Sequence, residues 1–194
     1  RERDRLGRLA ALDPGSRGRR GRKPYGSRAP RKRFLIVCEG AVTEVRYFEA
    51  FPVSREVHVV VRGEGKNTTS LVAAAVEHAD RSATPFDEVW VVYDHDDFGS
   101  QRFNQAEKDV RDLSDNRPEA WSTAWSNQAF EVWYVLHFQY FDGQLHRHLV
   151  QAKLGELLRT QCGCADGYAK NDPRMYEILL PYQPQAIRFA LRLA

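Results

Sequence analysis

The sequence has few cysteines and no long apolar run. Its 194 residues include three cysteines, Cys38, Cys162 and Cys164. An odd and sparse set argues against a disulfide framework and favours a reducing cytoplasm. No apolar run approaches the ~20 residues of a membrane span, and no basic start followed by an apolar stretch predicts secretion. These absences exclude a disulfide-rich secreted domain and an integral membrane protein, so we expect a cytoplasmic protein without a membrane partner.

What is present is material for a sizeable core and an uneven distribution of charge. Hydrophobic residues make up 42% of the chain and charged residues 28%, which is typical of a globular protein. The net charge of +3 divides unevenly, because residues 1–33 carry 13 basic and 3 acidic side chains whereas residues 34–194 carry 16 basic and 23 acidic ones. We therefore expect a basic arm (residues 1–33) and a separate globular domain (residues 34–194).

The basic arm is rich in Gly, Pro and Arg and poor in large apolar residues. Such a segment cannot bury enough surface to order itself, so we predict that it is intrinsically flexible. Arginine pairs with phosphate through two N–H groups and releases counterions, which favours nucleic acid as the partner. The alternatives are a solvated linker or a patch that meets the acidic domain. The candidate nucleic-acid-binding residues are Arg17, Arg19, Arg20, Arg22, Lys23, Arg28, Arg31, Lys32 and Arg33.

Apolar runs of strand length alternate with helical patterns through the first two thirds of the domain. The predicted strands are 34–38, 56–61, 89–93 and 119–125, and the predicted helices are 43–51, 69–79, 100–113 and 128–138. Thr43 should cap the first helix and Ser126-Asn127 the fourth. Further helices are expected at 145–158, from Asp172-Pro173 onward and at 186–194, the last stopping abruptly as if a further segment followed. The alternation predicts an α/β fold with a mostly parallel sheet, helices on both faces and a helical C-terminal portion.

Three carboxylates follow the third predicted strand within four residues, at Asp94, Asp96 and Asp97. Ligands of open α/β sheets bind at the carboxyl ends of strands. Carboxylates held this close repel each other unless a cation or a proton relieves them, and Mg²⁺ or Mn²⁺ prefers such oxygen ligands. The pattern predicts a metal site; the alternative is a solvated loop whose acids cap the next helix.

Further polar residues stand beside the predicted elements. Glu39 ends the first strand, so the parallel topology should bring it to the Asp94 edge of the sheet. Glu44 begins the first helix, where helix-end electrostatics is the alternative to a catalytic role. Glu131 lies on a heavily apolar helix and needs a partner, which could be a metal, a cation or a helix N-terminus.

Weaker candidates complete the set. Lys66 follows a strand in a Gly-rich loop, but Val60 and Asn67 break the nucleotide-binding P-loop pattern, so we expect at most a phosphate contact from the lysine. Asn127 could cap its helix or orient a ligand. His137 could position a substrate, although a satisfied core histidine is the commoner case. Lys170, in a polar loop, could offset phosphate charge.

Three motifs, with a shorter Tyr-x-Lys match as an addition, together resemble the RloB family. Phe34-Leu-Ile-Val-Cys-Glu39-Gly40-x-x-Thr43-Glu44-x-x-Tyr47-Phe48 is similar to its opening signature, with Ala41-Val42 as a departure from the more polar residues expected there. Val91-Val92-Tyr93-Asp94-x-Asp96-Asp97-Phe98 resembles its acidic strand end. Ser126-Asn127-x-x-Phe130-Glu131-x-Trp133-x-x-x-His137-Phe138 resembles its Ser-Asn-x-x-Phe-Glu helix, and Tyr168-Ala-Lys170 its Tyr-x-Lys.

The resemblance implies a Toprim-like fold in a bacterial anti-phage, abortive-infection protein that is often encoded beside an ATPase. Relatives in that setting are thought to act as nucleases. By fold-level analogy with Toprim effectors of defence systems, RNA, and transfer RNA in particular, is the favoured substrate.

Two hypotheses follow for the function. In the first, the protein is a Mg²⁺- or Mn²⁺-dependent nuclease. Asp94 and Asp96 hold the ion with Glu39, Asp97 or Glu131 as further ligands, Glu39 and Glu44 serve as catalytic carboxylates, and Lys170 or Lys66 faces the phosphate. In the second, the protein is a non-catalytic nucleic-acid-binding or regulatory subunit, docked to an ATPase or a ribonucleoprotein. Either form could assemble into a homo-oligomer.

Overall fold

The computed structural model describes residues 31–65, 67–95 and 100–193. The following sequence-predicted site residues lie outside these ranges: Arg17, Arg19, Arg20, Arg22, Lys23, Arg28, Lys66, Asp96 and Asp97. Within the described ranges, no helix combines the length and the apolar character that crossing a bilayer requires.

Four parallel strands form one sheet in the order β2-β1-β3-β4. Their bounds are β1 Lys32–Cys38, β2 Val57–Gly63, β3 Glu88–His95 and β4 Ala120–Asn127. The predicted α/β fold with a parallel sheet is thus confirmed. Because all strands run the same way, the residues that follow β1 and β3 reach the same edge of the sheet, where Cys38 is in register with Val92.

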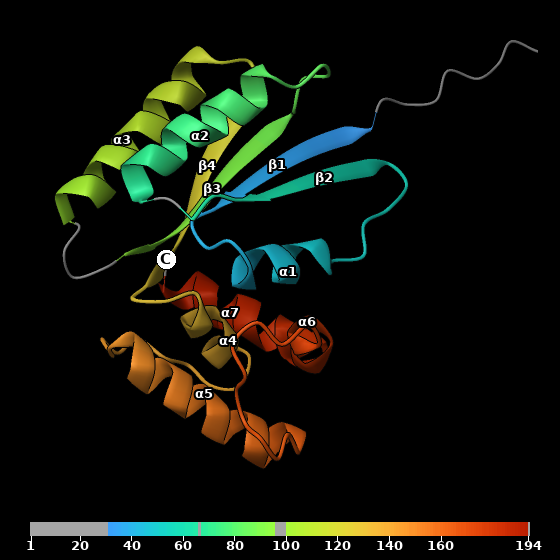
Figure 1. Ribbon diagram of the computed structural model, residues 1–194, viewed down its shortest axis with the longest axis vertical. Coiled ribbons are helices and arrows are strands. Elements are labelled where there is room, and N and C mark those ends of the chain that lie inside the picture. Colours follow the sequence, from blue (N-terminus) through green and yellow to red (C-terminus); the bar gives the residue numbers. More distant parts are fainter. Residues whose placement is uncertain (1–30, 66, 96–99, 194) are drawn as a thin grey trace, which may run out of the picture.

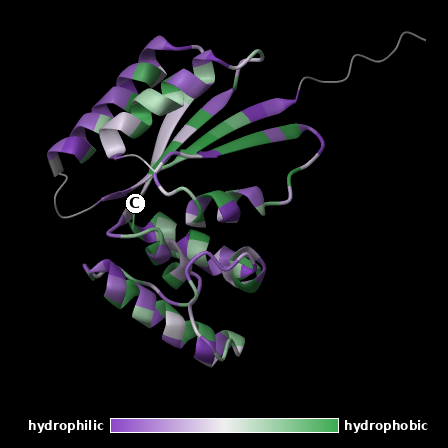
Figure 2. Ribbon diagram, in the orientation of Figure 1, coloured by the Kyte–Doolittle hydropathy of each residue, from purple (hydrophilic) through white to green (hydrophobic). Residues whose placement is uncertain are grey.

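One face of the sheet is covered by two helices, α2 (Thr68–Asp80) and α3 (Ser100–Asn116) (Figure 1). Alternate strand residues point to this face, and Leu35, Val37 and Val91 pack there with no exposed surface. Figure 2 shows the strands mostly green, with purple residues gathered at strand ends and on the outer helices. The central strands β1 and β3 are therefore the more buried ones, whereas β2 and β4 are mostly half-buried or exposed.

The opposite face carries α1 (Thr43–Glu49), α4 (Glu131–Leu136) and the helical C-terminal portion (Figure 1). The latter consists of α5 (Arg147–Cys162), α6 (Met175–Leu179), the short 3-10 helix η1 (Leu180–Tyr182) and α7 (Gln183–Leu193). Tyr47 lies at the centre of this second core, with its ring centroid 5.4 Å from that of Phe51 and 5.7 Å from that of Phe130. The predicted helices on both faces are thus confirmed.

Two predicted helix caps are wrong. Val42, not Thr43, is the N-cap of α1, and the Thr43 hydroxyl donates to Asn171 Oδ1 at 2.6 Å instead. Ser126 and Asn127 are the last residues of β4, because pairing with β3 continues as far as Asn127. Gln128 then turns the chain with a φ of 68°, and α4 begins only at Glu131. A long-range side-chain bond thus takes the Thr43 hydroxyl, and the strand ladder takes Ser126 and Asn127.

Candidate functional site

A cavity of about 490 Å³ opens at the carboxyl edge of the sheet. It is bounded by the turn after β1, the start of α1, the end of β3, the starts of α4 and α5, and the loop before α6. Its lining residues are Glu39, Gly40, Ala41, Val42, Thr43, Glu44, Gly65, Asn67, Asp94, Phe130, Glu131, Arg147, Lys170 and Asn171. We call this cavity the acidic pocket, because four carboxylates reach it.

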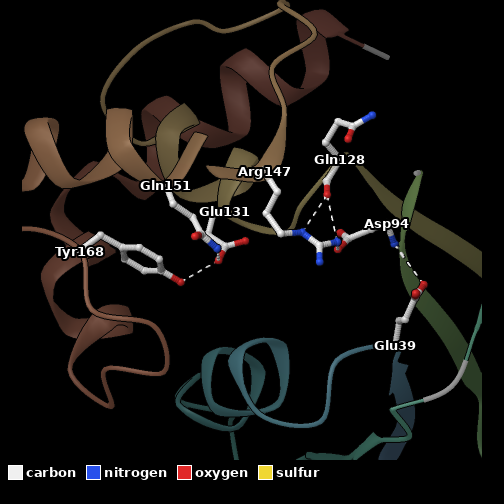
Figure 3. A network of polar contacts seen from close by, with 7 residues as sticks. All are labelled: Glu39, Asp94, Gln128, Glu131, Arg147, Gln151 and Tyr168. Atoms are coloured by element: carbon white, nitrogen blue, oxygen red, sulfur yellow. Dashed lines mark hydrogen bonds and ion pairs between the residues drawn. The ribbon is translucent and has the colours of Figure 1, made fainter. Parts of the chain in front are cut away.

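Glu39 and Asp94 come to the acidic pocket from the neighbouring strands β1 and β3. The Glu39 amide donates to Val92 O at 2.8 Å, which extends the ladder by one residue. The Asp94 amide in turn lies 3.4 Å from Glu39 Oε2 (Figure 3). The parallel topology therefore brings both residues to one cavity, as the sequence pattern predicts.

Arg147, the first residue of α5, also reaches Asp94. Its Nη2 lies 3.4 Å from Asp94 Oδ2, and its Nε and Nη2 donate to Gln128 O at 3.3 and 3.2 Å (Figure 3). No motif in the sequence marks this arginine. It follows Asp94 by 53 residues and becomes a pocket residue only through the packing of α5.

Glu131 lies deeper, with 5% of its surface exposed. Its Oε1 accepts hydrogen bonds from the Tyr168 hydroxyl at 2.9 Å and from Gln151 Nε2 at 2.8 Å (Figure 3). Burial and the neighbouring Glu131 charge raise the pKa of Tyr168, so that its hydroxyl remains a donor. The sequence predicts that Glu131 needs a partner, and the structure provides two neutral hydrogen-bond donors, Tyr168 and Gln151. These two donors were not predicted from the sequence. The Tyr-x-Lys motif was the signal for Tyr168.

Glu44 is equally buried, at 7% exposed, and its carboxylate lies directly over Gly40. A side chain at position 40 would overlap the Glu44 oxygens, so the glycine provides the space that the carboxylate occupies. Burial raises the pKa of Glu44, and the Glu131 charge adds to this; backbone N–H groups and Lys170 act in the opposite direction. The raised pKa of Glu44 favours its protonated form.

Two described carboxylates of the pocket, Glu39 and Asp94, have the oxygen chemistry that Mg²⁺ or Mn²⁺ takes. Among residues 31–65, 67–95 and 100–193, no group of three or more His, Cys, Asp or Glu side chains is arranged to hold a metal ion. Further donors would have to come from the acids that follow β3, and Asp96 and Asp97 lie outside the described residues. The described residues therefore supply two candidate oxygen ligands and do not form a metal site by themselves.

The remaining candidates are distributed over the molecule. Lys170 lines the acidic pocket. Asn127 lines a different cavity, of about 530 Å³, between β4, α4 and α7. His137 has no exposed surface and its Nδ1 lies 2.9 Å from Trp133 O. Burial lowers the pKa of His137 to about 4, so it is a neutral core histidine that does not line the acidic pocket.

The described end of the basic arm joins the sheet edge opposite the pocket. Lys32 and Arg33 are the first residues of β1, and Lys32 pairs with the Glu88 carboxylate. Arg33 donates to the Thr84 carbonyl and lies 4.6 Å from the centroid of the Phe86 ring. These two side chains anchor the start of the domain, whereas Arg31 precedes the strand and is exposed.

The fold and the pocket define an α/β protein with a parallel sheet and an acidic cavity at its carboxyl edge, the place where open sheets bind ligands. Residues 34–194 match the family model described as RloB-like protein. The chain belongs to the RloB-like family, as the three motifs predict. No curated protein and no solved structure matches the chain.

Proposed function

We propose that this protein is a metal-dependent nuclease, with RNA and in particular transfer RNA as substrate, that acts in the cytoplasm as a bacterial anti-phage effector. One observation carries the proposal. Glu39 and Asp94, from adjacent parallel strands, meet at the carboxyl edge of the sheet in a cavity that also receives Arg147 and Lys170. Paired carboxylates beside cations suit a divalent ion and a phosphodiester. The Toprim-like character and the defence role rest on the family resemblance alone.

The residues of the pocket have distinct roles in this proposal. Asp94, with Asp96 and Glu39, would hold Mg²⁺ or Mn²⁺, which when bound neutralises charge on the phosphate oxygens. Glu39 lines the pocket and can accept a proton from the attacking water or hydroxyl. Glu44, whose pKa burial raises, can donate a proton to the leaving oxygen. Lys170 faces the same cavity and offsets phosphate charge.

The deciding experiment incubates the purified protein with transfer RNA, messenger RNA and plasmid DNA, in Mg²⁺, in Mn²⁺ and in EDTA. We expect cutting of RNA that needs the metal. Glu39→Gln and Asp94→Asn should lose cutting by about 100-fold or more, the usual effect of removing a catalytic group, while binding is kept. Asp115→Asn, on an exposed position of α3, is the matched control. Cutting by a variant that lacks Glu39, Asp94 and Asp96 together would contradict the proposal.

A second candidate is a non-catalytic subunit that binds nucleic acid or partners an ATPase or a ribonucleoprotein. It is favoured by the contact of Asp94 with Arg147 and by the lack of a three-donor metal group among the described residues. Under this candidate the wild-type protein binds RNA but cuts nothing in either metal. Association with an ATPase, tested by mixing the two purified proteins and measuring their joint sedimentation, would support it.

A further inference from the structure

Among the described residues, Arg147 contacts two groups of the acidic pocket. Its Nε and Nη2 donate to the Gln128 carbonyl at 3.3 and 3.2 Å. Its described contact with Asp94 is 3.4 Å long, whereas a tight charge-assisted bond measures about 2.7–2.9 Å. Gln128 O thus holds the guanidinium beside Asp94 without a tight bond to that carboxylate (Figure 3).

Arg147 lies at the N-terminal end of α5, beside the carboxylates of the acidic pocket. Arg147 and His148 open α5, whose first turn contains no acidic residue. Helix N-termini carry partial positive charge, so a cation there is unfavourable unless an anion lies nearby. Half of the Arg147 side chain is exposed, against 14% of Asp94. The guanidinium can therefore exchange one anion for another without opening the protein.

A divalent cation at Asp94 would compete with Arg147, because a carboxylate oxygen that binds the metal no longer attracts the guanidinium to the same extent. An arginine has five N–H donors and can bond Gln128 O and a second acceptor together. A phosphate oxygen is the acceptor that its planar fork fits. In this arrangement a phosphate oxygen of the substrate replaces the Asp94 carboxylate as the second acceptor of Arg147.

We propose that Arg147 is a phosphate-binding residue of the acidic pocket, which pairs with Asp94 in the metal-free protein and transfers to a backbone phosphate of the nucleic acid once a divalent cation takes Asp94. The inference rests on the proposed function for the identity of the substrate. It makes two predictions of opposite sign for one variant: Arg147→Ala should bind metal more tightly and nucleic acid more weakly.

The first test measures Mn²⁺ binding to the full-length protein by electron paramagnetic resonance, without nucleic acid. Because Arg147→Ala removes a competitor for Asp94, we expect about two- to fivefold tighter binding, which corresponds to ~0.4–1 kcal/mol. Arg81→Ala is the matched control, since Arg81 also pairs with a carboxylate, Glu77, but on exposed α2 far along the chain from the pocket. An unchanged or weaker Mn²⁺ affinity of Arg147→Ala would overturn the proposal.

The second test measures anisotropy of a labelled single-stranded RNA 12-mer in EDTA and in Ca²⁺, which takes carboxylate ligands in flexible geometry. The basic arm contributes under both conditions, so the readout is the gain in affinity that the metal brings. Arg147→Ala should lose about tenfold or more of that gain, as expected for a charged hydrogen bond, and should behave as wild type in EDTA. A gain equal to that of Arg81→Ala would overturn the proposal.

Arg147→Lys keeps the charge without the fork and serves if Arg147→Ala does not fold, as checked by thermal unfolding. It should also lose most of the metal-dependent gain, because a lysine presents a point charge. The nuclease proposal can fail independently of this inference. If the wild-type protein cuts no RNA, the nuclease proposal is wrong, but the two binding measurements still decide the role of Arg147. Conversely, wild-type rates of RNA cutting by Arg147→Ala would overturn this inference and leave the nuclease standing.

Discussion

At the scale of single residues, the buried Glu44 carboxylate combines poor solvation with a position in the pocket. Its raised pKa means that the folded state binds a proton more tightly than the unfolded state. Stability therefore falls as the pH rises from the ordinary glutamate range through the raised value, and the cost persists above it. A glutamine of the same shape removes that cost.

We predict that Glu44→Gln melts about 2 °C or more above wild type at about pH 8 and that the difference shrinks toward about pH 4. Differential scanning calorimetry across this range measures the change. If Glu44 is a catalytic carboxyl, the same variant should lose RNA cutting while gaining stability. A variant that is less stable at alkaline pH would contradict the burial of a charged group, and Glu49→Gln on the exposed side of α1 is the control.

The pKa of His137 makes stability depend on pH in the opposite direction. Its neutral form is buried, and the folded-state pKa of about 4 lies below the ordinary value of 6.5. The stability that the neutral His137 contributes is complete above pH 6.5. It is lost as the pH falls toward 4, and the free energy of unfolding drops by about 3 kcal/mol between these two values. We predict that urea unfolding of His137→Leu is less acid-sensitive than that of wild type between about pH 6.5 and 4.

At neutral pH the same variant should be about 1 kcal/mol less stable, because the bond from Nδ1 to the Trp133 carbonyl is lost. His58→Gln, at an exposed position of β2, should keep the acid sensitivity of wild type. An acid dependence of His137→Leu identical to that of wild type would show that His137 is charged or hydrated in the folded protein.

The sequence predicts the strand-end carboxylates of the acidic pocket better than the residues that form hydrogen bonds and ion pairs with the pocket carboxylates. Glu39 and Asp94 were predictable because strand ends of a parallel sheet share one edge. Arg147 and Gln151 were not, because they reach the pocket through the packing of α5, and an amphipathic pattern does not specify which partner a helix meets. His137 illustrates the reverse: a polar residue type in a family motif that serves the core.

At the scale of elements, the turn after β1 is pressed against the end of β2. A methyl group on Gly63 would lie 2.7 Å from Gly40 O and 2.8 Å from Ala41 Cα, both backbone atoms that cannot rotate away. On Gly40, by contrast, the three nearest atoms all belong to the flexible end of the Glu44 side chain. An alanine at position 63 would therefore displace the turn after β1, whereas an alanine at position 40 would displace the Glu44 carboxylate.

We predict that Gly63→Ala destabilises the protein by about 1–3 kcal/mol, as overpacking does, whereas Gly40→Ala costs less stability but moves Glu44 out of its place. Chemical unfolding measures the first effect. For the second, the pH dependence of stability assigned to Glu44 should flatten in Gly40→Ala. Equal unfolding free energies for the two variants would show that the turn after β1 yields as easily as a side chain.

Element boundaries mark where sequence patterns stop being informative. All four strands were predicted within about two residues, because β-branched runs bounded by turn residues are a strong signal. The prediction failed between β4 and α4, where Ser126 and Asn127 are good helix caps by residue type but stay in the strand ladder. Pairing with β3 keeps Ser126 and Asn127 in the strand, and no pattern in the local sequence indicates this long-range pairing.

At the scale of the whole molecule, the described end of the basic arm and the acidic pocket lie at opposite edges of the sheet. Lys32 starts β1 at one edge and the acidic pocket lies at the other. If the basic arm grips a nucleic acid, its contacts are electrostatic and release counterions. Replacing Arg17, Arg19, Arg20, Arg22, Lys23 and Arg28 by glutamine should then reduce the slope of log Kobs against log[salt] by up to about 4 for single-stranded RNA.

Fluorescence anisotropy at several salt concentrations gives that slope. The control replaces Arg102, Lys108 and Arg111, three exposed basic residues of α3, and should leave the slope nearly unchanged. An arm variant with the wild-type slope would mean that the arm serves as a linker or contacts the acidic domain instead of RNA.

The hydrogen bond between Thr43 and Asn171 joins segments that are 128 residues apart, and it closes one wall of the cavity. During translation, a nascent chain that has not yet released the segment from Arg147 to Asn171 from the ribosome has the strand-end acids but no complete cavity. Whatever the cavity binds can therefore be held only once the chain has been synthesised through Asn171.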